Sequence, residues 1–148
     1  MKFEELEVGQ SAEFTKTISD EDVMLFAKVS GDFNPVHVDE AAAANSRFGS
    51  RIAHGLLTAG LISAAIAGKL PGPGSVYLSQ TLRFTAPVRI GETVTATVQV
   101  IEIVAAKRRV KLSTVCRNQK GETVVDGEAL VMVSEESSAS ERGVSSAT

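Results

Sequence analysis

The chain has little of several residue types that would mark a specialised class of protein. Its 148 residues include a single cysteine, Cys116, and two histidines, so no internal disulfide can form and too few ligands exist for a structural zinc site. Its 15 lysines and arginines stand against 18 acidic residues, a formal net charge of -3. No basic surplus exists to neutralise phosphates, which argues against a nucleic-acid binder.

Long hydrophobic runs are lacking too. Residues 54–68 carry no charge, but this stretch is shorter than the roughly 20 apolar residues that a membrane-spanning helix needs. The first residues, Met-Lys-Phe-Glu-Glu, lack the basic-then-apolar order of a secretion signal, so we expect a cytoplasmic protein. With 43% hydrophobic and 22% charged residues, the composition is typical of one globular domain.

Residues 30–37, Ser-Gly-Asp-Phe-Asn-Pro-Val-His, place a carboxylate and an imidazole five residues apart. Gly31 permits backbone angles closed to other residues, while Pro35 fixes its own φ and disfavours a helical conformation at Asn34. We therefore predict a tight loop that is neither regular helix nor strand. A loop that fixes Asp32 and His37 favours acid–base chemistry, although such residues are also ordinary in turns and a lone histidine often only packs.

Residues 54–68 predict a helix that is buried on all sides, because small and apolar residues surround its whole wheel. Its first turn would direct unpaired N–H groups and the positive end of the helix dipole at whatever lies beyond Gly55. An oxyanion or a polarised carbonyl fits there. Close packing would also explain Gly55, and the two roles are compatible.

Two shorter helices are predicted before this one. Ser19 is a typical N-cap, followed by an acidic first turn and by a helix that should end at Gly31. Residues 38–45, with four consecutive alanines, favour a second helix. In the loop that follows, Arg47 and Arg51 are expected to face solvent rather than a ligand phosphate.

Alternating apolar and polar residues predict strands in the rest of the chain. They cover residues 11–18 (as an edge strand), 76–84, 92–104, 110–116 and 123–133. One buried helix with several long antiparallel strands is an α+β arrangement, in which a sheet wraps around the helix. We expect this domain to span residues 1–133, and residues 134–148 to be a disordered polar tail.

Several short motifs occur together and in a defined order. They are Gly-Asp-Phe-Asn-Pro-Val-His at 31–37, His-Gly at 54–55, Gly-Ser-Val-Tyr-Leu-Ser-Gln at 74–80, Leu-Arg-Phe at 82–84 and Pro-Val at 87–88. Together they resemble the MaoC-like, (R)-specific enoyl-CoA hydratases of the hotdog fold. The resemblance covers nearly the whole chain up to about Val133. It implies a single hotdog domain and a homodimer whose sheets join edge to edge.

The same resemblance implies a reaction, the addition of water to a trans-2-enoyl-CoA to give a (3R)-hydroxyacyl-CoA. It assigns to Asp32 and His37 the joint activation of the water and the return of a proton to the α-carbon. It assigns to the backbone N–H of Gly55 the polarisation of the thioester carbonyl. Coenzyme A is then part of the acyl-CoA substrate, and no metal or separate cofactor is expected.

Further residues are candidates for substrate contacts by the same resemblance, namely Ser63, Ile66, Leu130, Arg83 and Asn34. Ser63 would lie near the acyl pocket and bond Asp32 or His37, although a helical serine by default bonds a carbonyl one turn earlier. Ile66 and Leu130 would line that pocket, or be ordinary core residues. Arg83 would meet coenzyme A phosphates. Asn34 is expected to shape its loop, and His54 to cap or pack the helix start.

Three alternatives stay open at this point. A dehydratase acting on acyl-carrier-protein substrates would use the same residues in the reverse direction. A hotdog thioesterase would not need the loop at 31–37. A non-catalytic acyl-thioester binder, or a silent subunit of a heterodimer, would need neither Asp32 nor His37, whose presence speaks against both.

Overall fold

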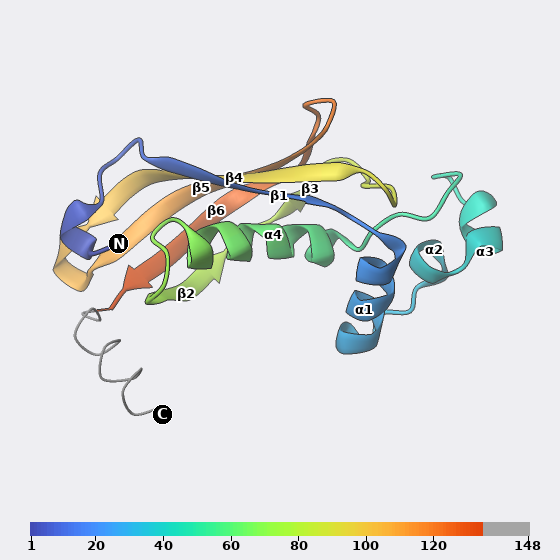
Figure 1. Cartoon of the computed structure of the whole chain (residues 1–148), viewed down its shortest axis with the longest axis horizontal. Coiled ribbons are helices and arrows are strands. Elements are labelled where there is room, and N and C mark those ends of the chain that lie inside the picture. Colours follow the sequence, from blue (N-terminus) through green and yellow to red (C-terminus); the bar gives the residue numbers. More distant parts are fainter. Residues whose placement is uncertain (135–148) are drawn as a thin grey trace.

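The computed structural model describes residues 1–134, so the predicted tail, apart from Ser134, lies outside the described residues. A six-stranded antiparallel sheet curves over the helix α4 (Gly55–Gly68), and Figure 1 shows this arrangement. The strand order is β1-β4-β5-β6-β2, with β3 paired to β6. The strands are β1 (Ser11–Thr17), β2 (Ser75–Gln80), β3 (Arg83–Phe84), β4 (Thr93–Val104), β5 (Arg109–Asn118) and β6 (Thr123–Val133). The predicted α+β class and the edge position of β1 are confirmed.

The long strands β4 and β5 form because their apolar residues alternate with polar ones. The buried residues on these strands are Val94, Ala96, Val98, Val100, Val110, Leu112, Thr114, Cys116 and Asn118. Ala96 pairs with Cys116 and Val100 with Leu112, so the two strands present their apolar side chains together. Ile62 and Ile66 of α4 belong to the same hydrophobic core. The predicted faces of these strands are confirmed.

The single strand predicted over residues 76–84 is wrong, because the chain makes two short strands with a break between them. At the break, the carbonyl of Thr81 lies directly over Gly127 of β6. A Cβ built on Gly127 would stand 1.8 Å from that carbonyl oxygen, so only glycine allows the close crossing. The close crossing at the break therefore depends on a glycine of β6 that lies far from Thr81 in the sequence.

The helix α4 is not buried on all sides, contrary to the prediction. Its core face carries Ile62 and Ile66, exposed by 0% and 2%, whereas Leu56 on the other face is 59% exposed and Ser63 is exposed as well. The sheet of one chain covers only one side of the helix. The residue types around the helical wheel do not indicate which side of the helix the sheet covers. No helix within residues 1–134 is long and apolar enough to cross a membrane.

Three helices form a separate group beyond one end of the sheet, to the right in Figure 1. The first, α1 (Asp20–Ser30), begins as predicted, with the Ser19 hydroxyl accepting from the Asp22 N–H at 3.1 Å. It ends at Gly31, whose φ of 85° is left-handed and suits glycine. The predicted second helix exists as α3 (Glu40–Ala44).

The segment predicted as a loop between these helices contains one helical turn, α2 (Pro35–Val38). Proline is well suited to the first position of a helix, because its missing N–H would have no partner there. The side-chain oxygen of Asn34 accepts from the Val36 N–H at 3.4 Å and caps the turn. Asn34 thus shapes the chain around it, and α2 carries His37.

Candidate active site

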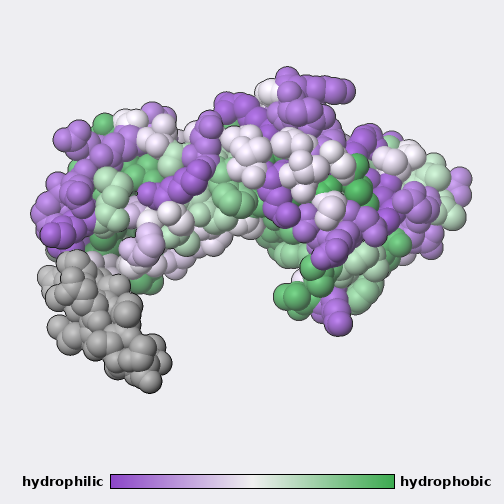
Figure 2. Space-filling view, viewed as in Figure 1, coloured by the Kyte–Doolittle hydropathy of each residue, from purple (hydrophilic) through white to green (hydrophobic). Residues whose placement is uncertain are grey.

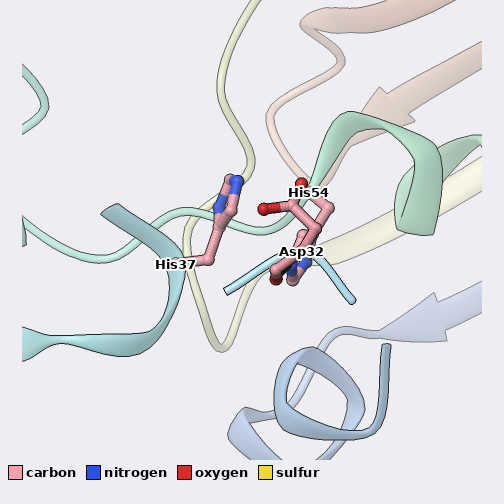
Figure 3. A group of neighbouring side chains, drawn as sticks. All are labelled: Asp32, His37 and His54. Carbon is pink, nitrogen blue, oxygen red and sulfur yellow. Dashed lines mark hydrogen bonds between the residues drawn. The ribbon is translucent and has the colours of Figure 1, made fainter. Parts of the chain in front are cut away.

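A cavity of about 590 Å³ opens where α1 and α2 meet the start of α4. Its lining includes Asp32, His37, His54, Gly55, Thr58 and Phe84. The two histidines, the aspartate and the first turn of the apolar helix therefore share one space, although they come from three segments of the chain. Figure 3 shows the three side chains gathered there.

His37 is held in one orientation by the chain that follows α3. Its ring is 8% exposed, and Nδ1 lies 2.7 Å from the backbone oxygen of Ile52. Because a carbonyl oxygen only accepts, Nδ1 carries the proton and donates it. In the neutral ring, Nε2 is then an unprotonated acceptor. A histidine fixed in this tautomer is equipped to take a proton from a neighbouring water.

Asp32 lies at the other side of the same space and is exposed. Its N–H donates to the Ser30 hydroxyl at 3.1 Å, and its Oδ1 accepts from the Asn34 N–H at 3.0 Å. The carboxylate is thereby oriented by its own loop while keeping further acceptor capacity. One polar atom from each of Asp32, His37 and His54 lies within 4.8 Å of the other two. This spacing suits a water molecule bound between the carboxylate and the imidazole.

His54 occupies the N-cap position of α4, but its side chain makes no cap bond, so of the two predicted alternatives, capping or packing, it does not cap. Its packing is confirmed: the ring is 3% exposed and stacks on His37, with ring centroids 4.0 Å apart and planes at 29°. Its Nε2 reaches back to the backbone oxygen of Asp32 at 3.0 Å. Burial lowers the pKa of His54, with the nearby His37 adding to the effect against the opposing influence of Asp32.

The cluster of Asp32, His37 and His54 contains residue types that ligate metals, but its geometry does not suit a metal ion. A metal ion needs the lone pairs of its histidine ligands to converge on one point. The two imidazoles are stacked at 29°, so the lone pairs in their ring planes run side by side. The arrangement fits a hydrogen-bonded water better than a metal centre.

The position of Gly55 is compatible with both roles considered for it, carbonyl polarisation and close packing. The first N–H groups that bond within α4 are those of Leu57 and Thr58, which donate to the His54 carbonyl at 3.1 and 3.2 Å. Among residues 1–134, the Gly55 N–H has no partner, and Gly55 lines the cavity. A Cβ on Gly55 would stand 2.5 Å from the ring of Phe84, so close packing also requires glycine here.

The other predicted substrate contacts lie away from this cavity in the single chain. Ser63 lines a shallow groove between α4 and β2, with Tyr77 and Leu78 among its neighbours. Ile66 is a core residue at 2% exposure, and Leu130 on β6 is partly buried. The side chain of Arg83 is 77% exposed and pairs with Asp126 at 3.2 Å. The substrate roles of Ser63, Ile66, Leu130 and Arg83 stay predictions.

Arg51 matters to the site in a way that the sequence did not indicate. Its side chain is only 10% exposed, so the expectation that it faces solvent is wrong. Its Nε donates to the His37 carbonyl at 2.6 Å, and its Nη1 lies 2.6 Å from Asp20 and 3.4 Å from Glu40. Arg51 thus ties α1, α2 and α3 together behind His37. Arg47, by contrast, is exposed and lines the cavity.

Thr58 is a second residue that sequence reasoning missed. It lies one turn after His54 on α4, lines the cavity and is 1% exposed. Among the described residues its hydroxyl has no hydrogen-bond partner. The available signal was its position four residues after His54, which places the two side chains on one face of the helix.

The fold and this site define a hotdog domain of the hydratase and dehydratase type. Residues 3–125 match the MaoC like domain, and the chain belongs to that family. It is 54% identical to a 3-hydroxybutyryl-CoA dehydratase of Methylorubrum extorquens over 131 residues, which cover 88% of this chain and 83% of that protein. It is 53% identical to an (R)-specific enoyl-CoA hydratase of Rhodospirillum rubrum over 131 residues, 88% and 90% of the two chains.

A solved structure agrees with these relatives. The unliganded R-hydratase PhaJ1 from Pseudomonas aeruginosa superposes with a TM-score of 0.87 at 55% sequence identity, covering 91% of this chain and 86% of that one. The predicted family, hotdog fold and hydro-lyase class are therefore confirmed.

Proposed function

We propose that this chain catalyses the reversible (R)-specific hydration of a trans-2-enoyl-CoA to a (3R)-hydroxyacyl-CoA. One observation carries the proposal: the Asp32 carboxylate and the His37 imidazole meet beside the unbonded N–H of Gly55 in one cavity. Hydration of an enoyl thioester needs those groups, since a base must activate water and a donor must stabilise charge on the carbonyl oxygen. The close relatives named above carry names for the same chemistry.

The reaction can be written with every atom assigned. A water held by Asp32 and His37 adds its oxygen to C3 of the enoyl group while His37 Nε2 accepts one of its protons. The electron pair of the C2=C3 bond moves toward the thioester oxygen, where the Gly55 N–H stabilises the enolate. The proton then passes from the His37–Asp32 pair to C2. The net change is the addition of one water, and no other reactant is needed.

The surroundings of the pair support these roles. The bond from His37 Nδ1 to the Ile52 carbonyl fixes the tautomer that leaves Nε2 unprotonated. When Nε2 takes the proton, the resulting cation lies beside the Asp32 carboxylate, which stabilises it. Because a single pair both removes and returns the proton, hydroxyl and hydrogen should arrive on the same face of the double bond.

A second copy of the chain fits the surface left open by this one. The edge strand β2 exposes Val76, Tyr77 and Leu78 by 41%, 40% and 40%, and the adjoining face of α4 exposes Leu56 by 59%. Figure 2 shows hydrophobic residues reaching the lower face of the molecule, whereas hydrophilic residues dominate its upper rim. An apolar edge of this kind is stabilised by pairing. We infer a homodimer, in which the groove at Ser63 would be closed.

The predicted acyl pocket belongs to this dimer. Ser63 and Leu78 line one groove in the single chain, and Leu130 pairs with Ser79 in the adjoining strand. A partner covering the groove would give Ser63 and Leu78 an apolar surface to share with an acyl chain; in the single chain Ile66 is buried in the core and Leu130 is partly buried, and neither lines this groove. Arg83 on the neighbouring β3 would be the residue to meet coenzyme A phosphates.

Hydration of crotonyl-CoA tests the proposal. Loss of the conjugated enoyl-thioester absorbance is followed, the product is resolved by chiral analysis, and crotonyl-acyl-carrier-protein is assayed alongside. Turnover of the coenzyme A thioester to the (3R) alcohol is expected. Faster turnover of the carrier-protein thioester would favour the alternative dehydratase. No turnover of either thioester would favour a non-catalytic subunit. Light scattering on the same preparation measures the mass and tests the homodimer.

A further inference from the structure

The mechanism above uses Asp32, His37 and Gly55 but leaves out a second buried histidine of the cavity, His54. His54 is 3% exposed, and it contacts both members of the proposed acid–base pair. It directly precedes Gly55, the first residue of α4. A buried histidine in this place must have a reason, since burying an imidazole costs free energy unless its polar atoms are used.

The first contact fixes the Asp32 loop. His54 Nε2 lies 3.0 Å from the backbone oxygen of Asp32, so Nε2 carries the proton and donates it. Asp32 is exposed, and its loop is otherwise held by short-range bonds from Ser30 and Asn34. The bond from His54 spans 22 residues and is the one that ties this loop to the start of α4.

The second contact fixes the His37 ring. The two imidazoles stack with centroids 4.0 Å apart, and the ring of Phe26 on α1 lies tilted against His54 with centroids 4.7 Å apart. The His37 ring can therefore not swing away from the Ile52 carbonyl toward His54. Stacking of this kind disfavours a charge on both rings at once, because two adjacent imidazolium rings would repel each other, so a neutral His54 lets His37 take up a proton.

We propose that His54 is a positioning residue for the hydration reaction, holding the Asp32 backbone by a hydrogen bond and the His37 ring by stacking. This role rests on the proposed function of the Asp32–His37 pair. His54 itself does not touch the reacting atoms: its Nε2 is used by the Asp32 carbonyl, and its Nδ1 is buried without a partner among the described residues.

A matched pair of substitutions separates the two contacts. His54→Gln places an amide donor near the position of Nε2, and His54→Phe keeps an aromatic ring but no donor. Since a misplacement of about 1 Å can cost roughly 10²-fold in rate, we expect His54→Phe to lower kcat on crotonyl-CoA by about 10- to 100-fold, with KM within about threefold. His54→Gln should lose less than about tenfold, because the bond to Asp32 is rescued.

Two results would overturn the proposal. One is a His54→Phe enzyme with the kcat of the wild type. The other is a His54→Gln enzyme that loses as much as His54→Phe while both variants melt with the wild-type cooperativity. An inactive wild-type enzyme would count against the proposed function instead, and the tautomer measurement described next would still decide the role of His54.

Nitrogen-15 NMR of the histidine rings provides a readout that does not depend on turnover. The proposal requires a neutral His54 with its proton on Nε2 and none on Nδ1. A proton on Nδ1, or rapid exchange between tautomers, would show that the bond to Asp32 does not form. The chain has two histidines, so His54→Gln assigns the signals directly.

The pH dependence of stability adds a second such readout. Burial lowers the pKa of His54 below its ordinary value, and the titratable groups that face it are His37 and Asp32. Below about pH 6.5, the ordinary pKa of histidine, His54 takes up a proton in the unfolded chain but resists it in the folded chain. The contribution of His54 to folding stability is therefore present above about pH 6.5 and is lost as the pH falls. The difference in unfolding midpoint between wild type and His54→Gln should therefore shrink as the pH falls below about 6.5.

Discussion

The sheet with α4 and the α1–α3 group are each stabilised by different interactions. The sheet and α4 enclose apolar side chains with almost no solvent exposure, such as Ile62, Val98 and Leu112 at 0%. The α1–α3 group is held by caps and by the bonds of Arg51 to Asp20, Glu40 and the His37 carbonyl. Hydrophobic burial dominates in the first part, whereas the second buries only three apolar side chains completely (Val23, Ala27 and Ala43) and depends on these directional polar bonds as well.

The difference teaches where stability and chemistry reside. Asp32 and His37 belong to the polar group, and Gly55 belongs to the apolar helix, so the site forms only where the two parts meet. The segment just before α4 connects the α1–α3 group to the helix, and there the Ala53 N–H donates to the Val88 carbonyl at 2.7 Å. Substitutions should therefore separate into those that remove activity and those that remove stability.

The largest expected effect is on turnover. His37→Asn keeps an amide donor near the position of Nδ1, which bonds the Ile52 carbonyl, but removes the base at Nε2. Since general acid–base groups contribute roughly 10²–10⁴-fold, kcat on crotonyl-CoA should fall by that factor for His37→Asn and for Asp32→Asn. Thermal unfolding should stay close to that of the wild type. Near-normal kcat in either variant would remove that residue from the mechanism.

The next largest effect is on the stability of the sheet and α4. Ile62 on α4 is fully buried, so Ile62→Ala leaves a cavity and should cost about 2–5 kcal/mol of the free energy of unfolding. The turnover of the molecules that remain folded should change little, because Ile62 does not line the active-site cavity. Denaturant unfolding and active-site concentration are measured on one preparation. A fall in kcat without a loss of stability would contradict the separation.

Arg51→Met tests the polar bonds that hold the α1–α3 group. It removes the bond to the His37 carbonyl and both ion pairs while keeping much of the side-chain volume. Because His37 would then be held less exactly, kcat should fall by about tenfold with little change in the unfolding of the sheet. Arg117→Met, at an exposed position on β5, is the matched control and should be silent. Equal behaviour of the two variants would show that Arg51 positions nothing.

The smallest effect concerns Thr58. Its buried hydroxyl has no partner among the described residues, and an unsatisfied buried polar group costs about 1–3 kcal/mol. Thr58→Val should therefore leave the free energy of unfolding unchanged or raise it by up to about 1 kcal/mol. A marked loss of stability in denaturant unfolding would show that the hydroxyl is satisfied by a bound water.

The sequence predicted what depends on local chemistry and regular period. Alternation located β4, β5 and β6, and Ser19 and Gly31 bounded α1. Cys116 is fully buried in the core, and burial raises the pKa of its thiol to about 12. Asp32, His37 and Gly55 also line one cavity, as the resemblance of the two motifs that carry them implied.

What the sequence did not predict depends on residues far apart in the chain. The close crossing at the break after β2 depends on Gly127, 46 positions after Thr81, which no local pattern reports. The open face of α4 and the burial of Arg51 follow from which elements pack against them. The helical turn at α2 is different, since Pro35 after a capping Asn34 is a helix-start signal that local chemistry offered.

Hydration of crotonyl-CoA in deuterated water tests the central claim most directly, namely that one Asp32–His37 pair both activates the water and protonates C2. The product is examined by NMR for its configuration at C3 and for the position of deuterium at C2. The account predicts a (3R)-hydroxyl with deuterium added at C2 from the same face. Deuterium on the opposite face, or a (3S) product, would contradict it, because the proton would then come from a group other than this pair.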